Sequence, residues 1–246
     1  MKKSILLPLT LLAAVRVLAA DPPTTNQLQE AIAKLQSAPN FSWTLALKIP
    51  GAPFEPGLLK GRAEKDGYAV ISQEIGDWQL DAVFKGDAIA LKNEGEWKLP
   101  DPGDMRAAMT AASVTRRGTP AIEAESLFKY ARELKAGEGN VLTSDLTEEG
   151  AKEVLSFGPR GGDDGPPPPK NAKGSVKFWL KDGALSRYES HVQGTMAFGP
   201  DGEDRDFEVT RTIEIQDVGT TKADVPAEAI KVLEPKVADS PEKPRN

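Results

Sequence analysis

The feature that most constrains the fold is an alternation of apolar and other residues that begins at residue 41 and recurs along the chain. The apolar positions of the first alternating segment are Phe41, Trp43, Leu45, Leu47 and Ile49. A period of two places these side chains on one face of a β-strand and the intervening side chains on the other. The chain is therefore expected to form an antiparallel sheet that buries one face and leaves the other in water.

Tight-turn dipeptides separate the next alternating segments, which predicts that neighbouring strands follow one another as a meander. Asp66-Gly67, Gly76-Asp77 and Gly86-Asp87 are pairs of this kind, and they favour short hairpin turns. A second block of strands is expected toward the carboxyl end. The predicted strands after the first span residues 58–65, 68–75, 78–85, 88–92, 175–181, 185–198 and 207–217.

Helical periodicity occurs before the first strand and between the two strand blocks. Residues 26–37 carry an apolar stripe typical of an amphipathic helix. Residues 101–136 are expected to hold two helices, the first capped by Asp101 and the second running to about residue 135. These segments predict an α+β fold with a single domain over residues 21–233, followed by a disordered tail at 234–246.

The first twenty residues predict export. A basic head, a short apolar run and small residues at Ala19 and Ala20 follow the order of a secretory signal peptide over residues 1–20, cleaved after either alanine. The apolar run is too short to remain in a bilayer. No second apolar run of spanning length follows in the sequence, so the chain is not expected to be an integral membrane protein.

Composition narrows the expected location and partners of the mature chain. The sequence has no cysteine, which leaves no disulfide and no lipidation site. We therefore expect a periplasmic protein that is not lipidated. Because three basic residues leave with the signal peptide, the net charge changes from −6 to −9. Such acidity argues against nucleic acid as a partner and against electrostatic docking on anionic lipid.

Few residues are suited to catalysis. The single histidine, His191, lies on the polar side of its predicted strand, where a solvent-facing position is expected. With one histidine and no cysteine, tetrahedral zinc sites and Ser-His-Asp or Cys-His arrangements are not expected. Asp81 and Glu94 are candidates for the carboxylate pair of a hydrolase, although their turn and polar-face positions favour solvated charge. The sequence therefore predicts no enzyme activity, no catalytic residue, no metal site and no cofactor.

The apolar residues admit two interpretations. The strand side chains either pack against the helices as a filled core, or they enclose a cavity for an acyl chain together with those helices. Methionines are suited to surfaces that accept more than one apolar shape, and Arg211 lies on an otherwise apolar strand face. The candidate ligand-binding residues are Trp43, Leu45, Leu47, Leu80, Phe84, Met105, Met109 and Arg211.

Several short segments occur in an order shared with a known superfamily. They are Phe41-Ser42-Trp43-Thr44-Leu45, Gly95-Glu96-Trp97, Leu146-Thr147-Glu148-Glu149, the stretch 174–183, and Val225-Pro226-Ala227. Over nearly the whole mature chain this order resembles the LolA/LppX-like lipoprotein carriers. The resemblance implies a strongly curved antiparallel half-barrel, closed by helices at about residues 101–136 that act as a lid over a hydrophobic cavity. Members carry lipids or lipidated proteins across the periplasm, and others sense the state of the envelope through partner proteins.

The resemblance also implies an inward arginine on an early strand that holds the lid by hydrogen bonds, but no arginine here aligns with it. Arg211 lies on a late strand instead, and if buried it needs a carboxylate or several carbonyls for its donors. The expected function is a periplasmic protein that binds the acyl chain of a lipid or lipoprotein. The alternative is an interaction or sensor module for envelope proteins, with a filled core and no ligand.

Overall fold

The structure, a computed structural model, describes residues 22–52, 56–65, 67–76, 78–156, 167–198 and 202–234. The predicted signal peptide and the predicted tail from residue 235 onward lie outside these ranges. Within them, the helices are too short or too polar to cross a bilayer.

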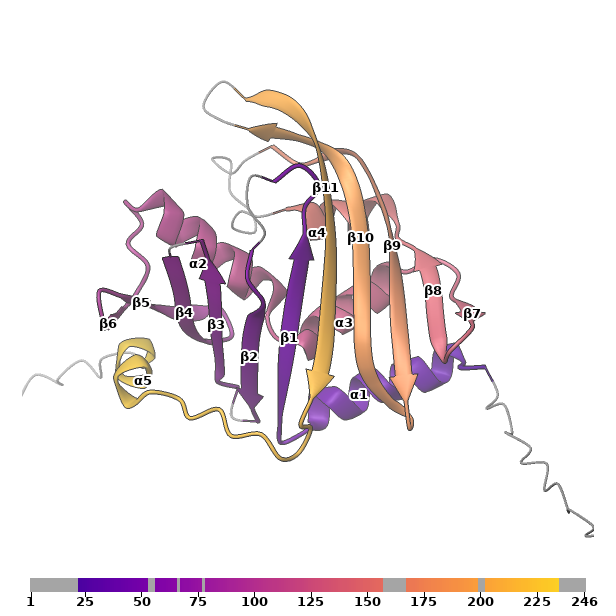
Figure 1. The fold of residues 1–246 in the computed structure, drawn as a ribbon, viewed down its shortest axis with the longest axis horizontal. Helices are drawn as coiled ribbons and strands as arrows, with labels where there is room; N and C mark the ends of the chain where they lie inside the picture. Colours follow the sequence, from indigo (N-terminus) through magenta and orange to yellow (C-terminus); the bar gives the residue numbers. More distant parts are fainter. Residues whose placement is uncertain are drawn as a thin grey trace, which may run out of the picture.

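One antiparallel sheet of eleven strands organises the described residues, in the order β6-β5-β4-β3-β2-β1-β11-β10-β9-β8-β7 (Figure 1). The first strand pairs with the last, so the two predicted strand blocks join into one continuous sheet with β6 and β7 at its edges. The strands are β1 (Asn40–Lys48), β2 (Leu59–Glu64), β3 (Ala69–Ile75), β4 (Trp78–Lys85), β5 (Ala88–Asn93), β6 (Glu96–Lys98), β7 (Lys135–Gly137), β8 (Val141–Asp145), β9 (Lys170–Lys181), β10 (Ala184–Phe198) and β11 (Glu203–Gln216).

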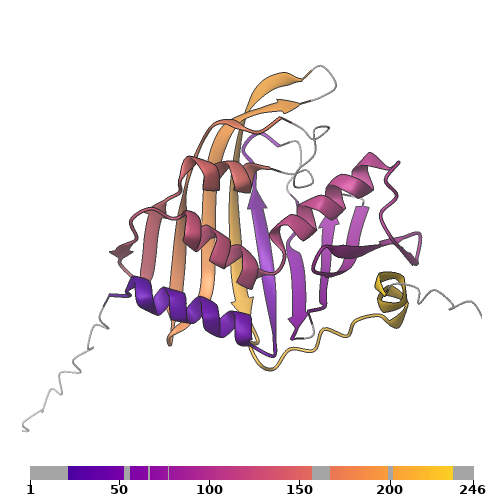
Figure 2. The same ribbon diagram turned by 180° about the vertical axis from the view of Figure 1, so that it is seen from behind.

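Helices cover both faces of this sheet, but unequally. Four of them lie on one face, called the inner face below (Figure 2): α1 (Thr25–Ser37), α2 (Met105–Arg117), α3 (Pro120–Tyr130) and α4 (Glu148–Leu155). The last helix, α5 (Ala227–Leu233), packs against β4, β5 and β6 on the outer face, where Ala229 meets Val83 and Ala90. The fold is the predicted α+β class, a curved, open half-barrel whose inner face is closed by helices.

The alternation of the sequence sets which side chains face inward. Along β1, Phe41, Trp43 and Leu45 are buried, whereas Ala46 and Lys48 are exposed. The inner face and its helices form the main hydrophobic core, to which α1 contributes an apolar stripe. That helix begins with a reciprocal capping box, in which the Thr24 side chain accepts from the Gln27 backbone and the Gln27 side chain accepts from the Thr24 backbone.

The inserted helices differ in detail from their predicted bounds. The cap of α2 is Asp104, whose carboxylate accepts from the backbone N–H groups of Arg106 and Ala107, so the prediction of Asp101 was wrong by three residues. Instead, Asp101 accepts from Gly103 N in the preceding turn.

The second predicted helix ends at Tyr130 and not near residue 135. From there the chain pairs with β8: Arg132 N donates to Asp145 O at 2.9 Å, and residues 135–137 form the edge strand β7. Long-range pairing thus overrides an apolar spacing that by itself favours continued helix.

Candidate functional site

A cavity of about 180 Å³ lies between the inner face of the sheet and the lid helices α2 and α3. Strands β1 to β4 and β11 form its wall, and the end of α2 with the start of α3 forms its cover. The residues that line it are Trp43, Leu45, Leu47, Ile49, Leu59, Ile71, Gln73, Leu80, Phe84, Ser113, Val114, Arg117, Gly118, Pro120, Glu123, Val209, Arg211 and Ile213. Most are apolar, so the cavity is a hydrophobic space whose lining also includes a few polar side chains.

The apolar wall follows directly from strand alternation. Trp43 and Leu45 project inward from β1, and Leu80 and Phe84 project inward from β4; all four are buried. The indole of Trp43 lies flat against the neighbouring strand at Gly61, where a Cβ atom would stand 2.1 Å from the ring. The glycine therefore makes room for the largest side chain of the cavity wall.

The polar part of the lining includes a buried ion pair between the sheet and the lid. Arg211 on β11 donates to Glu123 Oε1 on α3 through Nη2 at 3.0 Å and Nε at 3.2 Å. Both side chains are about one-tenth exposed. The second carboxylate oxygen of Glu123 accepts from the Tyr188 hydroxyl of β10 at 2.9 Å. One carboxylate on the lid thus joins two strands of the sheet.

Tyr188 is fully buried, and its ionisation is suppressed. Burial, together with the charge of Glu123 and the hydrogen bond to it, raises the pKa of Tyr188 well above its usual value. The phenol therefore stays a hydrogen-bond donor to Glu123 over the whole physiological pH range.

A second arginine, Arg117 at the end of α2, also lines the cavity. Its Nη1 donates to Ser113 O at 2.9 Å and its Nη2 to Val154 O at 3.1 Å, which ties α2 to α4. Burial of the guanidinium and the nearby charge of Arg211 lower the pKa of Arg117 to about 9. Arg117 is therefore still positively charged at neutral pH.

The neighbouring residue, Arg116, forms a second ion pair. Arg116 Nη2 and Glu153 Oε2 are 2.8 Å apart, with the side chains 12% and 27% exposed. This pair joins α2 to α4, as the backbone contacts of Arg117 do. Charged groups with little access to solvent therefore hold α3 to the sheet and α2 to α4.

The buried contacts of Glu123 oppose separation of the lid from the sheet. A buried ion pair adds little net stability, because desolvation offsets its attraction, but removal of one partner leaves an uncompensated charge. Separating α3 from the sheet therefore has to hydrate Arg211 and Glu123 at the same time. We use the word latch for the three side chains Arg211, Glu123 and Tyr188.

Six of the eight predicted site residues lie around this one cavity: Trp43, Leu45, Leu47, Leu80, Phe84 and Arg211. That these residues bind a ligand stays a prediction. The requirement stated for a buried Arg211 is met by a carboxylate, that of Glu123.

The two methionines lie on the predicted lid helix but outside the cavity lining, so their part in ligand binding stays a prediction. Met105 and Met109 are 75% and 45% exposed on α2 and do not contribute to the cavity lining. The helix instead directs Ala111, Val114 and Arg117 inward. The apolar residues from Met105 to Ala112 form a stripe beside the one that faces the cavity. Alanines on several sides of α2 leave the orientation of the helix poorly specified by its sequence.

Sequence reasoning missed Glu123, Tyr188 and Arg117. A signal existed for Glu123: it precedes the buried Leu127 by four residues, so it shares the apolar face of α3. A carboxylate on such a face indicates a buried partner of opposite charge. Tyr188 and Arg117 gave no such signal, because their burial depends on how α2 and α3 pack against the sheet.

A larger cleft of about 490 Å³ adjoins the cavity. It lies between the end of α1, the hairpin turns at the lower edge of the meander and the turn from α2 to α3. Phe84 and Gly118 line both spaces. The turn from α2 to α3 therefore stands between a small inner cavity and a larger outer cleft.

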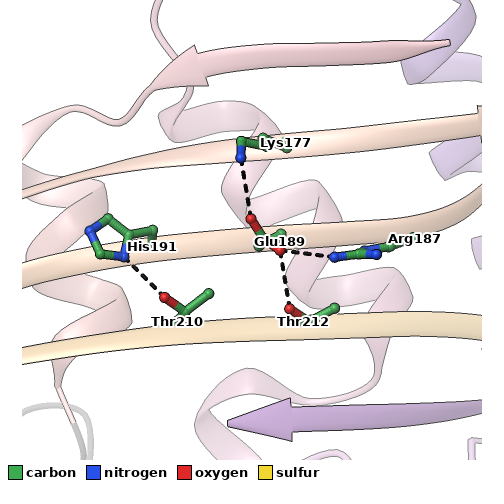
Figure 3. A network of polar contacts seen from close by, with 6 residues as sticks. All are labelled: Lys177, Arg187, Glu189, His191, Thr210 and Thr212. Carbon is green, nitrogen blue, oxygen red and sulfur yellow. Dashed lines mark hydrogen bonds and ion pairs between the residues drawn. The ribbon is translucent and has the colours of Figure 1, made fainter. Parts of the chain in front are cut away.

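The outer face of β9, β10 and β11 carries a polar network (Figure 3). Glu189 accepts from Lys177 at 3.4 Å, Arg187 at 2.9 Å and Thr212 at 3.2 Å. Although burial raises the pKa of Glu189, the hydrogen bonds from Arg187 and Lys177 hold it below its usual value. The side chains of this network belong to a face of the sheet that is exposed to water. Such a face is ordinary for an antiparallel sheet.

His191 belongs to the same outer face, as its position on the polar side of the strand predicted. Its Nδ1 lies 3.0 Å from Thr210 Oγ1, and its side chain is 41% exposed. Among the described residues, histidine and acidic side chains do not gather into groups of three or more that could hold a metal ion. Of the candidate carboxylate pair, Asp81 accepts a hydrogen bond from Gln79. Glu94 is exposed on a turn.

Comparison with known proteins finds similar solved structures but no similar sequence. No family model and no curated protein matches the chain. LprF from Mycobacterium bovis matches with 10% identity and a TM-score of 0.44, over 82% of this chain and 97% of that chain. The lipoprotein LppX from Mycobacterium tuberculosis matches with 9% identity and a TM-score of 0.46, over 80% and 96%. A LolA-superfamily protein from Nitrosomonas europaea matches with 8% identity and a TM-score of 0.35, over 87% and 98%.

These three matches span most of each chain at low sequence identity. At these identities and scores the likeness concerns the arrangement of helices and strands. It says nothing about a ligand of this chain.

Proposed function

We propose that this chain is an exported periplasmic protein that holds the acyl chain of a lipid or lipoprotein non-covalently between its sheet and its lid helices, without catalysis. The observation that carries the proposal is the hydrophobic cavity beneath α2 and α3, closed by the latch. Ligand sites of this kind are concave and mostly apolar, with a few polar groups at defined positions. Export and the periplasmic location follow from the predicted signal peptide and belong to the proposal.

The size of the cavity implies that the lid moves on binding. At about 180 Å³ the inner space is smaller than the ~300–1,000 Å³ typical of ligand pockets. Outward movement of the turn from α2 to α3 would connect it with the 490 Å³ cleft, because Phe84 and Gly118 border both. The structure then corresponds to the closed state, and the ligand-bound state is wider.

The latch sets the free energy of this opening. A ligand shifts such an equilibrium by its difference in affinity for the two states, and a few kcal/mol suffice. Burial of an acyl chain supplies about 0.8 kcal/mol for each methylene. Several buried methylenes therefore offset the cost of separating Arg211 from Glu123, and release of the ligand allows the pair to re-form.

One observation favours a second candidate, an envelope interaction or sensor module without a ligand. The small inner volume fits a core that is nearly filled, since a dry apolar cavity of roughly 150 Å³ can persist in a folded protein. In this case the lid helices are ordinary core elements, and the function lies on the surface.

Native mass spectrometry separates the two candidates. The protein is purified without detergent from its own periplasm and is measured intact and after organic extraction. A stoichiometric lipid or lipopeptide supports the proposal. A ligand-free mass, with no uptake of added lipid, contradicts it and favours the interaction module.

A matched pair of variants locates the binding. Leu45→Glu places a carboxylate in the cavity wall, whereas Ala46→Glu places the same group on the exposed face of the same strand. We expect Leu45→Glu to abolish lipid binding with the fold retained, and Ala46→Glu to bind as the wild type does. Loss of the fold in Leu45→Glu would mean that this face is filled core.

A further inference from the structure

We propose that Gln73 determines which ligands this cavity prefers, because its carboxamide accepts a hydrogen bond from a neutral donor, an amide N–H or a hydroxyl, next to the acyl chain. This inference rests on the proposed function and deepens it, from an apolar chain to a chain with a defined linking group. Gln73 lies on β3 and lines the cavity, and its side chain is 6% exposed. An ester has no such donor, so the inference separates amides and alcohols from esters.

Gln73 is a polar residue at an inward position of its strand. The buried positions of β3 alternate, and the two that precede Gln73 are Ala69 and Ile71. Leu80, which is directly opposite on β4, lines the same cavity. Alternation favours an apolar side chain here, since a polar group loses its hydration on burial. A glutamine at this position therefore needs hydrogen-bond partners in the protein or in a ligand.

The protein satisfies only part of this carboxamide. Gln73 Nε2 donates to Gly57 O at 2.9 Å. Because a backbone carbonyl only accepts, this bond also identifies which end of the carboxamide is the nitrogen. Among the residues that the structure describes, Gln73 Oε1 has no hydrogen-bond partner. Buried side-chain oxygens are normally bonded, so this acceptor is available to a donor that those residues do not supply.

The unpaired oxygen is open to the cavity. In the described part of the chain, the side-chain atoms that are both enclosed and unpaired are Arg187 Nε and Ser190 Oγ. Gln73 Oε1 is not one of them, so it keeps some accessible surface. The space that its side chain borders is the cavity. A donor group inside the cavity can therefore reach this oxygen.

The carboxamide is also held in place before any ligand binds. Gly57, its partner, is paired with β3 a second time, through a bond of 2.9 Å from Gly57 N to Glu74 O. The close approach requires glycine, because a Cβ atom at this position would stand 2.6 Å from Glu74 O. An acceptor that is oriented in advance loses little entropy on binding. This arrangement suits recognition better than a freely rotating side chain does.

Recognition by Gln73 is separate from the latch. Strands β2 and β1 lie between β3 and β11, so three strand spacings, roughly 14 Å, separate the backbone of Gln73 from that of Arg211. A linking group can therefore bind Gln73 without displacing Glu123 from Arg211. The latch then controls opening, and Gln73 controls which chain is preferred.

Four probes with the same twelve-carbon chain test the inference. N-methyldodecanamide and dodecanol carry a hydrogen-bond donor, whereas N,N-dimethyldodecanamide and methyl dodecanoate do not. Their affinities are measured with the wild-type mature protein by displacement of a fluorescent fatty ester, at concentrations below those at which the probes aggregate. We expect at least one donor probe to bind about fivefold tighter than both probes without a donor, which is the scale of one neutral hydrogen bond. The amide and the alcohol distinguish the two sources of the donor.

The outcomes separate this inference from the proposed function. Equal affinity for probes with and without a donor overturns the role of Gln73 and leaves the acyl-chain proposal standing. If none of the four probes binds, and the fluorescent ester does not bind either, both are overturned.

Matched variants assign the preference to Gln73. Gln73→Met keeps the length of the side chain but lacks the carboxamide, so we expect its affinities for probes with and without a donor to agree within about twofold, with its affinity for methyl dodecanoate retained. Gln79→Met makes the same change at an exposed position of β4 and should keep the full preference. A structural role for Gln73 predicts a different result, in which all four affinities fall together and the preference survives. That result in Gln73→Met, or a full preference at unchanged affinity, would overturn the inference.

Discussion

The half of the sheet built from β8 to β11 differs from the half built from β1 to β5 in how completely helices cover its inner face. Under α1, α3 and α4, the inward side chains Phe178, Tyr188 and Val192 have no exposed surface. Under α2, which lies wholly within the described stretch 78–156, the cover is thin: the helix has a single buried residue, Ala111. One continuous sheet therefore has a filled core at one side and a cavity at the other.

The boundary between the two halves is the latch. Tyr188 on β10 and Arg211 on β11 belong to the filled half, which pairs with the other half through β11 and β1, and Glu123 belongs to the lid. Stability and ligand binding can therefore be assigned to separate parts of one fold. The half from β8 to β11 stabilises the sheet. The cavity beside β1 to β5 can change in volume, because little of the core depends on α2.

The largest effect that tests this contrast is a matched truncation in the two halves. Phe178 on β9 and Phe84 on β4 are both nearly inaccessible, at 0% and 3% exposed. Phe178→Ala should lower the free energy of unfolding by about 4 kcal/mol, whereas Phe84→Ala, which borders existing space, should lower it by about 3 kcal/mol. Urea denaturation of both variants measures the difference. An equal or larger loss for Phe84→Ala would mean that both halves are packed alike.

The next effect comes from the latch. Glu123→Gln keeps the shape of the side chain but leaves Arg211 without its counter-charge, so we expect a loss of about 3 kcal/mol. Because the closed state is destabilised, the variant should also bind an apolar ligand faster than the wild type in stopped-flow measurements. Glu125→Gln, on the exposed side of the same helix, is the control for both quantities. Slower binding by Glu123→Gln would contradict the assignment of a latch.

Tyr188 gives a smaller effect that depends on pH. Its hydroxyl contributes about 1 kcal/mol through the bond to Glu123, so Tyr188→Phe should be less stable by that amount at neutral pH. Because the pKa of Tyr188 is raised in the folded state, the unfolded chain releases this proton first as pH increases. The advantage of the wild type is therefore complete below about pH 10, the usual pKa of tyrosine, and is lost at higher pH. Denaturant unfolding at pH 7 and pH 11 checks this sign, and a gap that widens with pH would contradict it.

The smallest effect concerns the exposed side of α2. The double variant Met105→Ser and Met109→Ser should change stability by less than about 0.5 kcal/mol, since both side chains are largely in solvent. Lipid affinity should also be unchanged. A marked loss of affinity would show that these methionines reach the ligand in the open state.

The sheet could be predicted from the sequence because its signal is local. A period of two in β1 and β4 places Trp43, Leu45, Leu80 and Phe84 on one face, whatever lies above them. The same alternation placed Arg211 on the inner face and His191 on the outer one.

The lid could not be predicted in the same way, because its details depend on contacts between distant segments. The rotation of α2, the end of α3 at Tyr130 and the pairing of Arg211 with Glu123 each follow from how helices settle on the sheet. Helical periodicity specifies a stripe only when one side is clearly apolar, and the alanines of α2 blur that distinction. Sequence therefore predicts the wall of the cavity better than its cover.

In the proposed function, an acyl chain enters the space beneath the lid, next to Trp43. Fluorescence quenching by a brominated stearic acid tests it directly, because bromine quenches an indole on contact and Trp43 lines the cavity, whereas Trp179 lies on the outer face beside Arg187. We predict saturable quenching that is lost in Trp43→Phe and retained in Trp179→Phe. Quenching that is absent in the wild type, or that persists in full in Trp43→Phe, would contradict binding of an acyl chain beneath the lid.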